Sequence, residues 1–485
     1  MNPPKPLEFT LDLAAAVADF YEYSMAEANL QERFSGIQTV FDLVVRKMPI
    51  NKVIGAFEHE GIKYDQLTTR NYLVNCGLEQ GLAYILGGKG NKELKEYMQN
   101  VQGITNQAFL GWVEQFKFEG DVYALPEGTI FFAQEPQLRV HERFEEAQIY
   151  ESLILSTINS QTNVCTTAND ISDVVAKDKI LLEGGSRRAS SPQSSLFNSR
   201  AARCGGFTAS SNVAYGLEYG EKVGGTHGHS YVMLHPSEYT AFKAQGKLFE
   251  KKVCFLLDTY NVSSALAIAL QVITEEKIGH FAFRIDSGDL LTQALWLHKK
   301  LKEQGYSRDQ YELVASDDLT AGKIDRLEKE GADIDKYLVG TYVVNPPKPL
   351  GGVYKLAAFQ ETDGSWCLRG KLSEEPCKST LPGIKQVYRV TGADGYYKKD
   401  IIAFDGEDLS DYLSEKDTVE ALLIPAIKEG KLVYGCPSIN EISSRRKQQL
   451  SKFKDIANYE VIISTGIRVK QQEILHQYGL KAGGK

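Results

Sequence analysis

Phe281-Ala282-Phe283-Arg284-Ile285-Asp286-Ser287-Gly288-Asp289 is the stretch that decides the fold, because a short apolar run ends abruptly at a polar cluster. A run dominated by phenylalanine, alanine and isoleucine predicts a strand that is buried on both faces. The Asp-Ser-Gly-Asp segment predicts a turn into a helix. Parallel α/β folds bind their ligands at this end of a strand, so the same stretch also indicates a site.

The same alternation repeats on both sides of this stretch. Further buried strands are predicted at Val253–Leu257, Tyr311–Ala315 and Tyr337–Val339. The segments between the strands are long enough for crossover helices, at Ser263–Glu275, Leu290–Gln304 and Ala321–Gly331. Repeated β-α units in a parallel sheet are therefore the economical interpretation, and either a barrel or an open sheet satisfies it.

The flanking segments predict a mixture of helices and strands. Asp19–Leu30 has helical spacing, Phe41–Val45 is typical of a strand, and Asp121–Val140 alternates as hairpins do. Glu145–Val175 predicts helices, which favours a domain boundary near residue 140. Beyond Gly351-Gly352 the pattern becomes less regular, which indicates a third, smaller region.

Composition excludes several classes of protein. The chain has 485 residues, 42% of them hydrophobic and 24% charged, and a net charge of −8. This balance argues against a broad nucleic-acid or anionic-membrane surface, and no uncharged apolar run is long enough to span a bilayer. The seven cysteines are scattered without a Cys-x-x-Cys pair, so we expect neither a zinc site nor a disulfide framework. A cytoplasmic location fits best.

Polar residues follow each predicted strand. Asp286 and Asp289 could accept sugar hydroxyls or hold a hydrated Mg²⁺, although residues of this type also cap helices and both roles can coexist. Gly340-Thr341 could bind a phosphate with help from Ser316, or simply form a tight turn. The remaining strand ends carry Asp258-Thr259 and Asp317-Asp318.

Further candidates lie outside these strand ends. The segment Gly225–Ser230 combines glycines with hydroxyls and two imidazoles, so it could bind a phosphate and accept one, or form a structural turn. Arg187 and Arg188, beside a flexible glycine pair, could clamp an anion, or form a surface pair with Glu183 as partner. Arg284 lies inside an apolar strand and needs an anionic partner or ligand, unless it faces a polar seam outside.

An aromatic side chain in the predicted N-terminal helix is another candidate. Tyr21 could stack on a planar ligand, although a helix tyrosine more often belongs to a core or an interface.

Taken in order, these segments resemble the nicotinate phosphoribosyltransferase family along the whole chain. The segments with counterparts in that family are Asp19–Met25, Phe41–Pro49, Ile158-Asn159 with Gln161, Arg187–Ala189, Ser211-Asn212, Gly225-Thr226 with His229-Ser230, Asp258–Tyr260, Arg284–Leu290, Val339–Thr341, Leu350–Leu356 and Pro437-Ser438.

The resemblance implies an irregular α/β barrel with a mixed α+β domain built from the N- and C-terminal segments. It places the mixed domain at 1–140, the barrel with the active site at 141–360, and a region packing with the N-terminal domain at 361–485. It implies a cytoplasmic homodimer with shared active sites, which joins nicotinate to 5-phosphoribosyl 1-pyrophosphate with Mg²⁺. ATP would be a co-substrate whose hydrolysis is coupled through a phosphohistidine.

The resemblance also implies roles for single residues. His229 would be the phosphohistidine. Tyr21, Thr226 and Arg284 would contact nicotinate, with Tyr21 reaching across the dimer. The ribose phosphate would lie at Thr341. The residues expected to complete the substrate and metal contacts are Arg188, Ser316, Gly340, Asp286 and Asp289, of which the last two would orient the ribose and Mg²⁺.

Departures from the family pattern leave rival interpretations open. His227-Gly228 replaces an apolar residue and alanine, Ser190 replaces glutamine, and Asn261 replaces aspartate, so it is ambiguous whether His227 or His229 is phosphorylated. The rivals are an enzyme of the same fold that uses nicotinamide, a quinolinate phosphoribosyltransferase, and a non-catalytic ligand-binding or scaffold relative.

Overall fold

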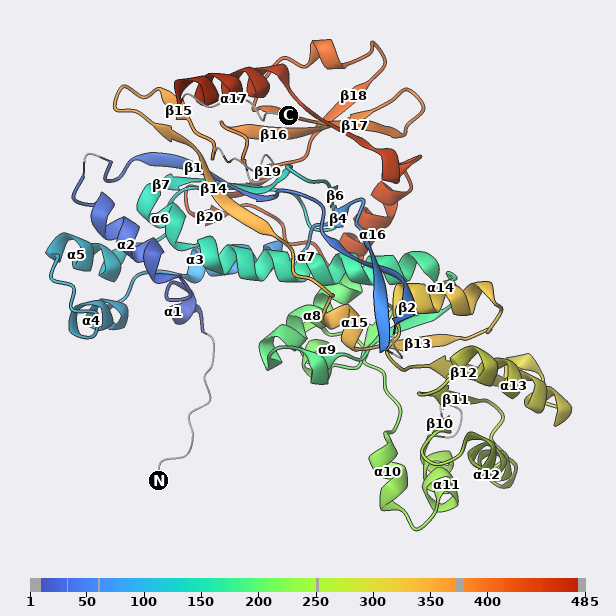
Figure 1. Ribbon diagram of the computed structural model, residues 1–485. Coiled ribbons are helices and arrows are strands. Elements are labelled where there is room, and N and C mark those ends of the chain that lie inside the picture. Colours follow the sequence, from blue (N-terminus) through green and yellow to red (C-terminus); the bar gives the residue numbers. More distant parts are fainter. Residues whose placement is uncertain are drawn as a thin grey trace. The chain divides into compact units, whose positions relative to one another are not determined.

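A computed structural model describes residues 10–32, 34–59, 62–249, 253–371, 373 and 379–478 (Figure 1). The chain divides into two compact units. The first contains Met1–Pro49, Arg70–Asn163 and Pro349–Lys485, and the second contains Ile50–Thr69 and Val164–Lys348. The boundaries near residues 140 and 360 stay predictions. None of the described helices is long and apolar enough to cross a membrane.

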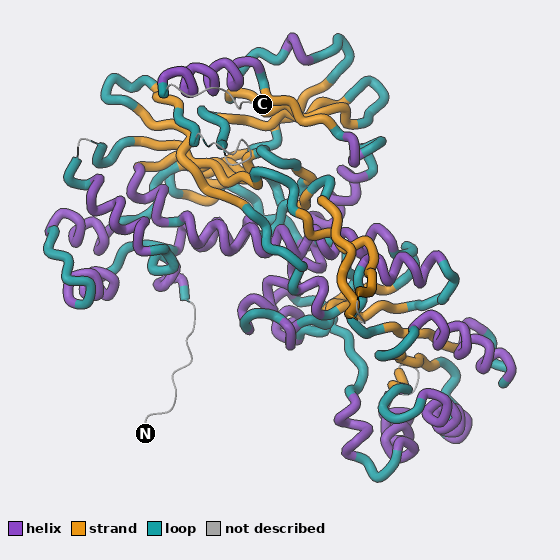
Figure 2. The backbone as a smooth tube through the Cα atoms, in the orientation of Figure 1, coloured by secondary structure: helices purple, strands orange, loops and turns teal. Residues whose placement is uncertain are grey.

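The second unit is built around a parallel sheet with the strand order β10-β11-β12-β13-β8-β9. Its strands are β8 (Ile180–Glu183), β9 (Ala209–Ser210), β10 (Cys254–Leu256), β11 (Phe281–Ile285), β12 (Tyr311–Ala315) and β13 (Lys336–Val339). Its helices are α8 (Pro192–Cys204), α9 (Val213–Tyr219), α10 (His229–Leu234), α11 (Glu238–Phe249), α12 (Val262–Glu275), α13 (Leu290–Glu303), α14 (Ala321–Lys329) and α15 (Thr341–Val344). From β10 to α15, strands and α-helices alternate along the chain; Figure 2 draws the strands orange and the helices purple.

The predicted β-α repeat is confirmed. All residues of β11 and β12 except Arg284 and Glu312 are buried, as expected for strands covered on both faces. Polar caps begin the connecting helices: the Asn261 side chain accepts a hydrogen bond at the start of α12, and Asp289 does so at the start of α13.

The closed barrel is not confirmed. β9 and β10 do not pair within the described residues, so the sheet is open at that seam. The α/β class is correct, and the sheet also contains β8 and β9, which the sequence pattern did not identify as strands.

The hairpin of β2 (Ile50–His59) and β3 (Ile62–Thr69) belongs to the second unit although it lies early in the chain. Val53 N on β2 donates a hydrogen bond to Tyr342 Oη on α15 at 3.3 Å. The hairpin therefore supports the segment that follows β13.

The first unit contains mixed and antiparallel sheets. One has the order β15-β14-β1-β7-β5-β19-β20, another has the order β18-β16-β17-β21, and β4 pairs with β6. The strands are β1 (Gln38–Val45), β4 (Leu73–Val74), β5 (Asp121–Ala124), β6 (Ile130–Phe131), β7 (Pro136–Arg143), β14 (Gly352–Gln360), β15 (Trp366–Leu368), β16 (Lys385–Thr391), β17 (Tyr397–Phe404), β18 (Thr418–Ala421), β19 (Ile424–Lys428), β20 (Lys431–Leu432) and β21 (Glu460–Ile463).

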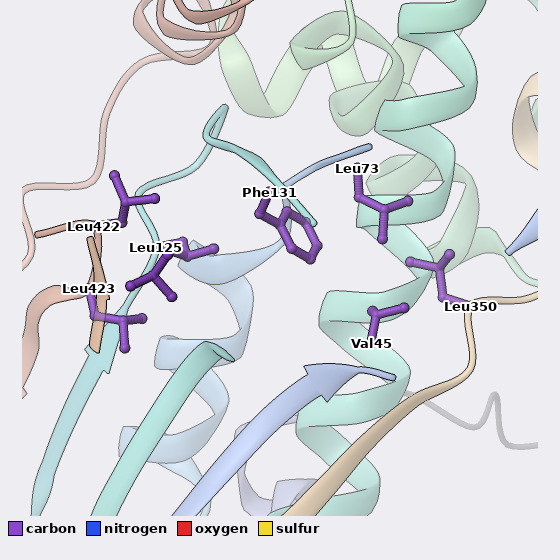
Figure 3. Close-up of a cluster of buried hydrophobic side chains, with 8 residues drawn as sticks. Val45, Leu73, Leu125, Phe131, Leu350, Leu422 and Leu423 are labelled. Carbon is purple, nitrogen blue, oxygen red and sulfur yellow. The ribbon is translucent and has the colours of Figure 1, made fainter. Parts of the chain in front are cut away.

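The helices of this unit are α1 (Leu11–Ala14), α2 (Phe20–Asn29), α3 (Leu78–Gly87), α4 (Lys92–Asn100), α5 (Gln107–Gln115), α6 (Phe144–Ile149), α16 (Ile439–Leu450) and α17 (Thr465–Gln477), while α7 (Glu151–Val174) has residues in both units. Figure 3 shows part of the core of the first unit, where Val45, Leu73 and Phe131 pack with leucines from later segments. Residues from both ends of the chain therefore share one core.

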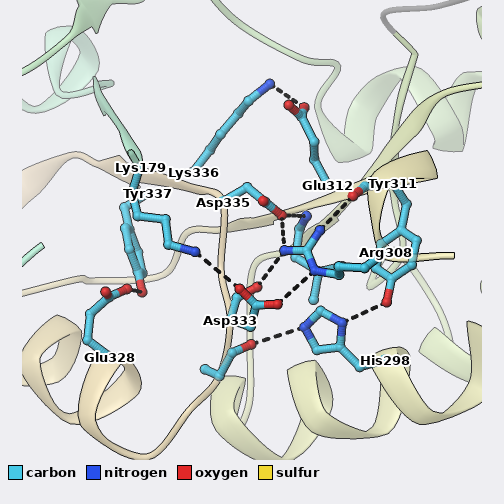
Figure 4. A network of polar contacts seen from close by, with 12 residues as sticks. Lys179, His298, Arg308, Tyr311, Glu312, Glu328, Asp333, Asp335, Lys336 and Tyr337 are labelled. Carbon is cyan, nitrogen blue, oxygen red and sulfur yellow. Dashed lines mark hydrogen bonds and ion pairs between the residues drawn. The ribbon is translucent and has the colours of Figure 1, made fainter. Parts of the chain in front are cut away.

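A polar network occupies the amino ends of β12 and β13 (Figure 4). Arg308 donates hydrogen bonds to Asp333 Oδ2 and Asp335 Oδ2, each at 2.7 Å, and His298 Nδ1 lies 2.8 Å from Tyr311 Oη. This network ties the two strands together at the edge opposite the predicted site. Residues at that edge of a parallel α/β fold usually stabilise the fold and do not bind ligand.

Candidate active site

A cavity of about 210 Å³ opens at the carboxyl ends of the parallel strands. It is lined by Arg187, Arg188, Arg284, Asp286, Ser316, Asp317, Asp318, Leu338, Gly340 and Thr341. The structure thus brings together most of the residues predicted from sequence, because parallel strands present their carboxyl ends at one edge.

Arg284 points into this edge rather than toward a polar seam outside. Its side chain is 12% exposed. Its Nε donates to Ser316 Oγ at 2.9 Å, its Nη1 donates to Thr226 Oγ1 at 3.1 Å, and its Nη2 lies 2.9 Å from Asp286 Oδ2. The guanidinium is therefore held in a fixed orientation by partners from three segments.

Asp286 connects this arginine to His229. Its Oδ2 lies 3.4 Å from His229 Nε2, and His229 Nδ1 lies 3.2 Å from Thr259 Oγ1. Burial opposes ionisation of Asp286, but hydrogen bonding by Ser316 and the charge of Arg284 outweigh it and hold its pKa below the ordinary value. The His229 side chain is 40% exposed, so its ring can be reached by a ligand.

Asp258, at the end of β10, belongs to the same cluster. Its Oδ2 accepts a hydrogen bond from Ser287 Oγ at 2.6 Å, and its Oδ1 is buried without a hydrogen-bond partner, 4.0 Å from His229 Nε2. The sequence places Asp258 at a strand end, as it does Asp286, but indicates no individual role for it.

Asp289 caps α13. Its Oδ1 accepts a hydrogen bond from the Thr292 backbone N–H at 2.8 Å, and this bond lowers the pKa of the Asp289 carboxyl. The capping interpretation of this residue is therefore observed, while its part in metal binding stays a prediction.

The loop after β12 has a strained backbone. Asp317 and Asp318 adopt φ values of 95° and 38°, which residues other than glycine rarely adopt. Burial, reinforced by the charges of Asp318, Asp286 and Asp258, raises the pKa of Asp317. Strain of this kind collects at ligand sites, where the surrounding structure enforces it.

The arginine turn after β8 is close-packed rather than flexible. A Cβ on Gly184 would lie 2.5 Å from Leu338 Cδ1, and one on Gly185 would lie 2.4 Å from Val344 Cγ1, so the glycines permit a close approach. Arg187 and Arg188 are exposed at the cavity. Glu183 is buried and, within the described residues, forms no ion pair with them.

His227 and Tyr21 are not among the residues that line the cavity. Both ring nitrogens of His227 are buried without partners, and burial, with the nearby charges of Arg284 and His229, lowers its pKa to about 4. Tyr21 lies on α2 in the first unit and is 46% exposed, so its contact with a ligand stays a prediction.

Comparisons with known proteins identify the family of this chain. A family model for the nicotinate phosphoribosyltransferase N-terminal domain matches residues 17–159, and one for the C-terminal domain matches residues 384–458. Nicotinate phosphoribosyltransferase of Bacillus subtilis is 33% identical over 409 residues, which cover 83% of this chain and 79% of that protein. The chain belongs to the nicotinate phosphoribosyltransferase family.

A further relative and two solved structures are also similar to this chain. The human nicotinate phosphoribosyltransferase is 30% identical over 430 residues, covering 71% of this chain and 78% of that protein. The crystal structure of human nicotinic acid phosphoribosyltransferase superposes with a TM-score of 0.76 at 23% identity, covering 94% of this chain and 99% of that one. That of nicotinate-nucleotide pyrophosphorylase from Pyrococcus furiosus gives 0.71 at 22% identity, covering 93% and 100%. These structures share the fold of this family member.

Proposed function

We propose that the chain joins nicotinate to 5-phosphoribosyl 1-pyrophosphate, forming nicotinate mononucleotide and pyrophosphate for NAD biosynthesis, and couples this reaction to ATP hydrolysis through His229. The observation that carries the proposal is the chain of contacts from Arg284 through Asp286 to His229 at the edge of one cavity. A non-catalytic scaffold has no need of such a cluster.

Nicotinate would bind at Arg284. The planar guanidinium matches a carboxylate, and Ser316 and Thr226 hold it in place. Nicotinamide has no carboxylate, so this arrangement favours nicotinate over the rival substrate. Tyr21 would stack on the pyridine ring, supplied by the partner subunit of a dimer.

The phosphoribosyl group would lie along the cavity wall. Thr341, Gly340 and Ser316 would contact the 5-phosphate, and Arg188 would bind a phosphate of the substrate. The pyridine nitrogen attacks C1 of the ribose while the bond from C1 to pyrophosphate breaks. Positive charge develops on the sugar, so the task of these residues is positioning and electrostatic support.

The carboxylates of the site fit Mg²⁺. Among the described residues, no group of three or more His, Cys, Asp or Glu side chains is arranged to hold a metal by itself. Mg²⁺ commonly takes only one or two carboxylates and completes its shell with water and phosphate oxygens. Asp286 and Asp289 are the ligands predicted from the sequence, and the unpartnered Oδ1 of Asp258 would be a further ligand. When bound, Mg²⁺ supplies neutralisation of the pyrophosphate charge.

His229 is the proposed phosphate acceptor. Its ring nitrogen would take the γ-phosphoryl group of ATP and release ADP, and water would later return the histidine and free phosphate. Asp286, next to Nε2, would hold the proton of the neutral ring on that nitrogen and leave Nδ1 as the nucleophile. Both ring nitrogens of His227 are buried, whereas the side chain of His229 is 40% exposed, which favours His229 as the phosphate acceptor.

The strand order supports the irregular barrel. β8 and β13, the first and last strands of this sheet along the chain, are hydrogen-bonded neighbours. The described strands therefore follow one another in chain order around the sheet, and closure needs only the seam between β9 and β10. The homodimer and the cytoplasmic location belong to the same proposal.

The test is product formation from nicotinate and phosphoribosyl pyrophosphate with Mg²⁺, with and without ATP. We expect ATP to stimulate the wild type and the matched control His227→Leu, and not His229→Ala. Product from nicotinamide but not from nicotinate would overturn the substrate, and no product from either would favour a binding protein.

A further inference from the structure

Glu183, the last residue of β8, is a buried carboxylate with uncharged donors around it. It is 0% exposed. Its Oε1 accepts a hydrogen bond from the Gly185 N–H, and its Oε2 accepts from Ser199 Oγ at 2.8 Å and from Ser210 Oγ at 2.6 Å. A buried charge is costly unless it is fully hydrogen-bonded, so these donors explain how the carboxylate is tolerated.

These donors belong to separate segments of the second unit. Gly185 precedes the short turn Ser186–Arg188, which carries the cavity arginines. Ser199 lies on α8. Ser210 ends β9. One side chain therefore joins the arginine turn to a helix and to a neighbouring strand.

Ser210 extends this connection to the other side of the site. Its Oγ accepts a hydrogen bond from Asn212 N at 3.0 Å, and its carbonyl accepts from Gly224 N at 3.0 Å. Gly224 leads directly into the segment of Thr226 and His229, and Thr226 contacts Arg284.

We propose that Glu183 is a positioning residue that fixes the arginine turn, and with it Arg188, relative to the segment of Thr226 and His229. This inference rests on the proposed function, because it assumes that Arg188 binds phosphoribosyl pyrophosphate. Glu183 does not line the cavity or touch the substrate. It acts through the residues that it holds.

The carboxylate is needed because it accepts from several donors at once. Glutamine has nearly the same shape, but its NH₂ group would face a donor instead of accepting from it. The arginine turn would then shift, and a displacement of about 1 Å is enough to weaken a positioned contact strongly. Binding of the phosphates that is equally strong in the ground state and in the transition state lowers KM and leaves kcat unchanged, so its loss raises KM.

The experiment compares Glu183→Gln, Ser210→Ala, Arg188→Ala and the double variant Glu183→Gln/Arg188→Ala. We expect Glu183→Gln to raise KM for phosphoribosyl pyrophosphate about tenfold with kcat changed less than about threefold. Ser210→Ala, which keeps the charge and removes one donor, should raise KM less. The effects of Glu183→Gln and Arg188→Ala should not multiply, because both remove the same contact.

The matched control is Glu328→Gln. Glu328 accepts a hydrogen bond from Tyr337 Oη within the network at the opposite edge of the sheet. The neutral amide accepts this bond more weakly, so the variant should have a lower unfolding midpoint and an unchanged KM. An unchanged KM in Glu183→Gln or Ser210→Ala, or independent effects in the double variant, overturns the proposal.

Calorimetric binding of phosphoribosyl pyrophosphate with Mg²⁺ separates this proposal from the proposed function. If the wild type forms no nicotinate mononucleotide, the proposed function fails. Weaker binding by Glu183→Gln then still supports the positioning role, and unchanged binding still overturns it.

Discussion

Among single residues, Arg284 should determine the choice of substrate. Lysine at this position keeps the charge but loses the planar fork that reaches Ser316, Thr226 and Asp286 together. We expect Arg284→Lys to lower kcat/KM for nicotinate about 100-fold and to change KM for phosphoribosyl pyrophosphate little. Steady-state rates with nicotinate and nicotinamide test this. An unchanged preference between the two substrates would remove Arg284 from the nicotinate site.

Glu22, on α2, should make stability depend on pH. It is fully buried, and its Oε1 accepts a hydrogen bond from Ser152 Oγ at 2.7 Å. Burial, only partly offset by this bond, raises the pKa of Glu22 from 4.5 to about 7. The folded protein therefore holds this proton more tightly than the unfolded chain, so stability falls as pH rises from about 4.5 to about 7.

Removing the ionisable group should remove that loss. We expect Glu22→Gln to be more stable than the wild type by about 2 kcal/mol at pH 8 and nearly equal to it at pH 5. Urea unfolding at the two pH values measures the difference. A difference that is the same at both values would mean that Glu22 does not titrate in this range.

At the scale of elements, the two ends of β12 and β13 should have separable roles. Arg308 bonds Asp333 and Asp335 at the amino ends, away from the cavity (Figure 4). We expect Arg308→Ala to lower the free energy of unfolding by about 1 kcal/mol, since the arginine is partly exposed, and to leave both KM values unchanged. Denaturation and kinetics on one preparation check this. A raised KM would show that the two edges are coupled.

The elements that the sequence predicts best are buried strands. β11 and β12 occupy the expected residues, because strands covered on both faces read as continuous apolar runs that stop at polar turns. Asp-Gly pairs are typical of tight turns, and Asp363-Gly364 and Asp394-Gly395 each lie between paired strands, with positive φ at the glycine.

Elements with few residues or distant partners were missed. β8 and β9 are too short for a clear pattern, and without them the arginine turn after Glu183 is not recognised as another strand end. The glycine pair looked flexible, since close packing against Leu338 and Val344 is invisible in sequence. Of the two roles that the pattern of acids left open for Asp289, capping is observed in its bond to Thr292, and metal binding stays a prediction.

For the whole molecule, mixed dimers test whether the active sites are shared. If Tyr21 completes the partner's site, a heterodimer of Tyr21→Ala and Arg284→Ala chains has one site with both replacements and one with neither. We expect a random mixture of the two inactive variants to regain about a quarter of wild-type activity.

Two observations would contradict this arrangement. One is an isolated heterodimer without activity, and the other is a molecular mass in light scattering that equals one chain. The first would place Tyr21 and Arg284 of one chain at the same site, and the second would remove the partner altogether.

In the ion pair between Arg284 and Asp286, the aspartate balances the charge of the arginine at the cavity. If nicotinate binds at Arg284 as proposed, its carboxylate competes with Asp286 for the guanidinium, and Asp286 can keep its contact with His229. Binding would then exchange one carboxylate for another at Arg284, and nicotinamide, which is neutral, has no carboxylate to replace that of Asp286. Where both compounds are present, the charge of the ligand would then decide which of them binds at Arg284.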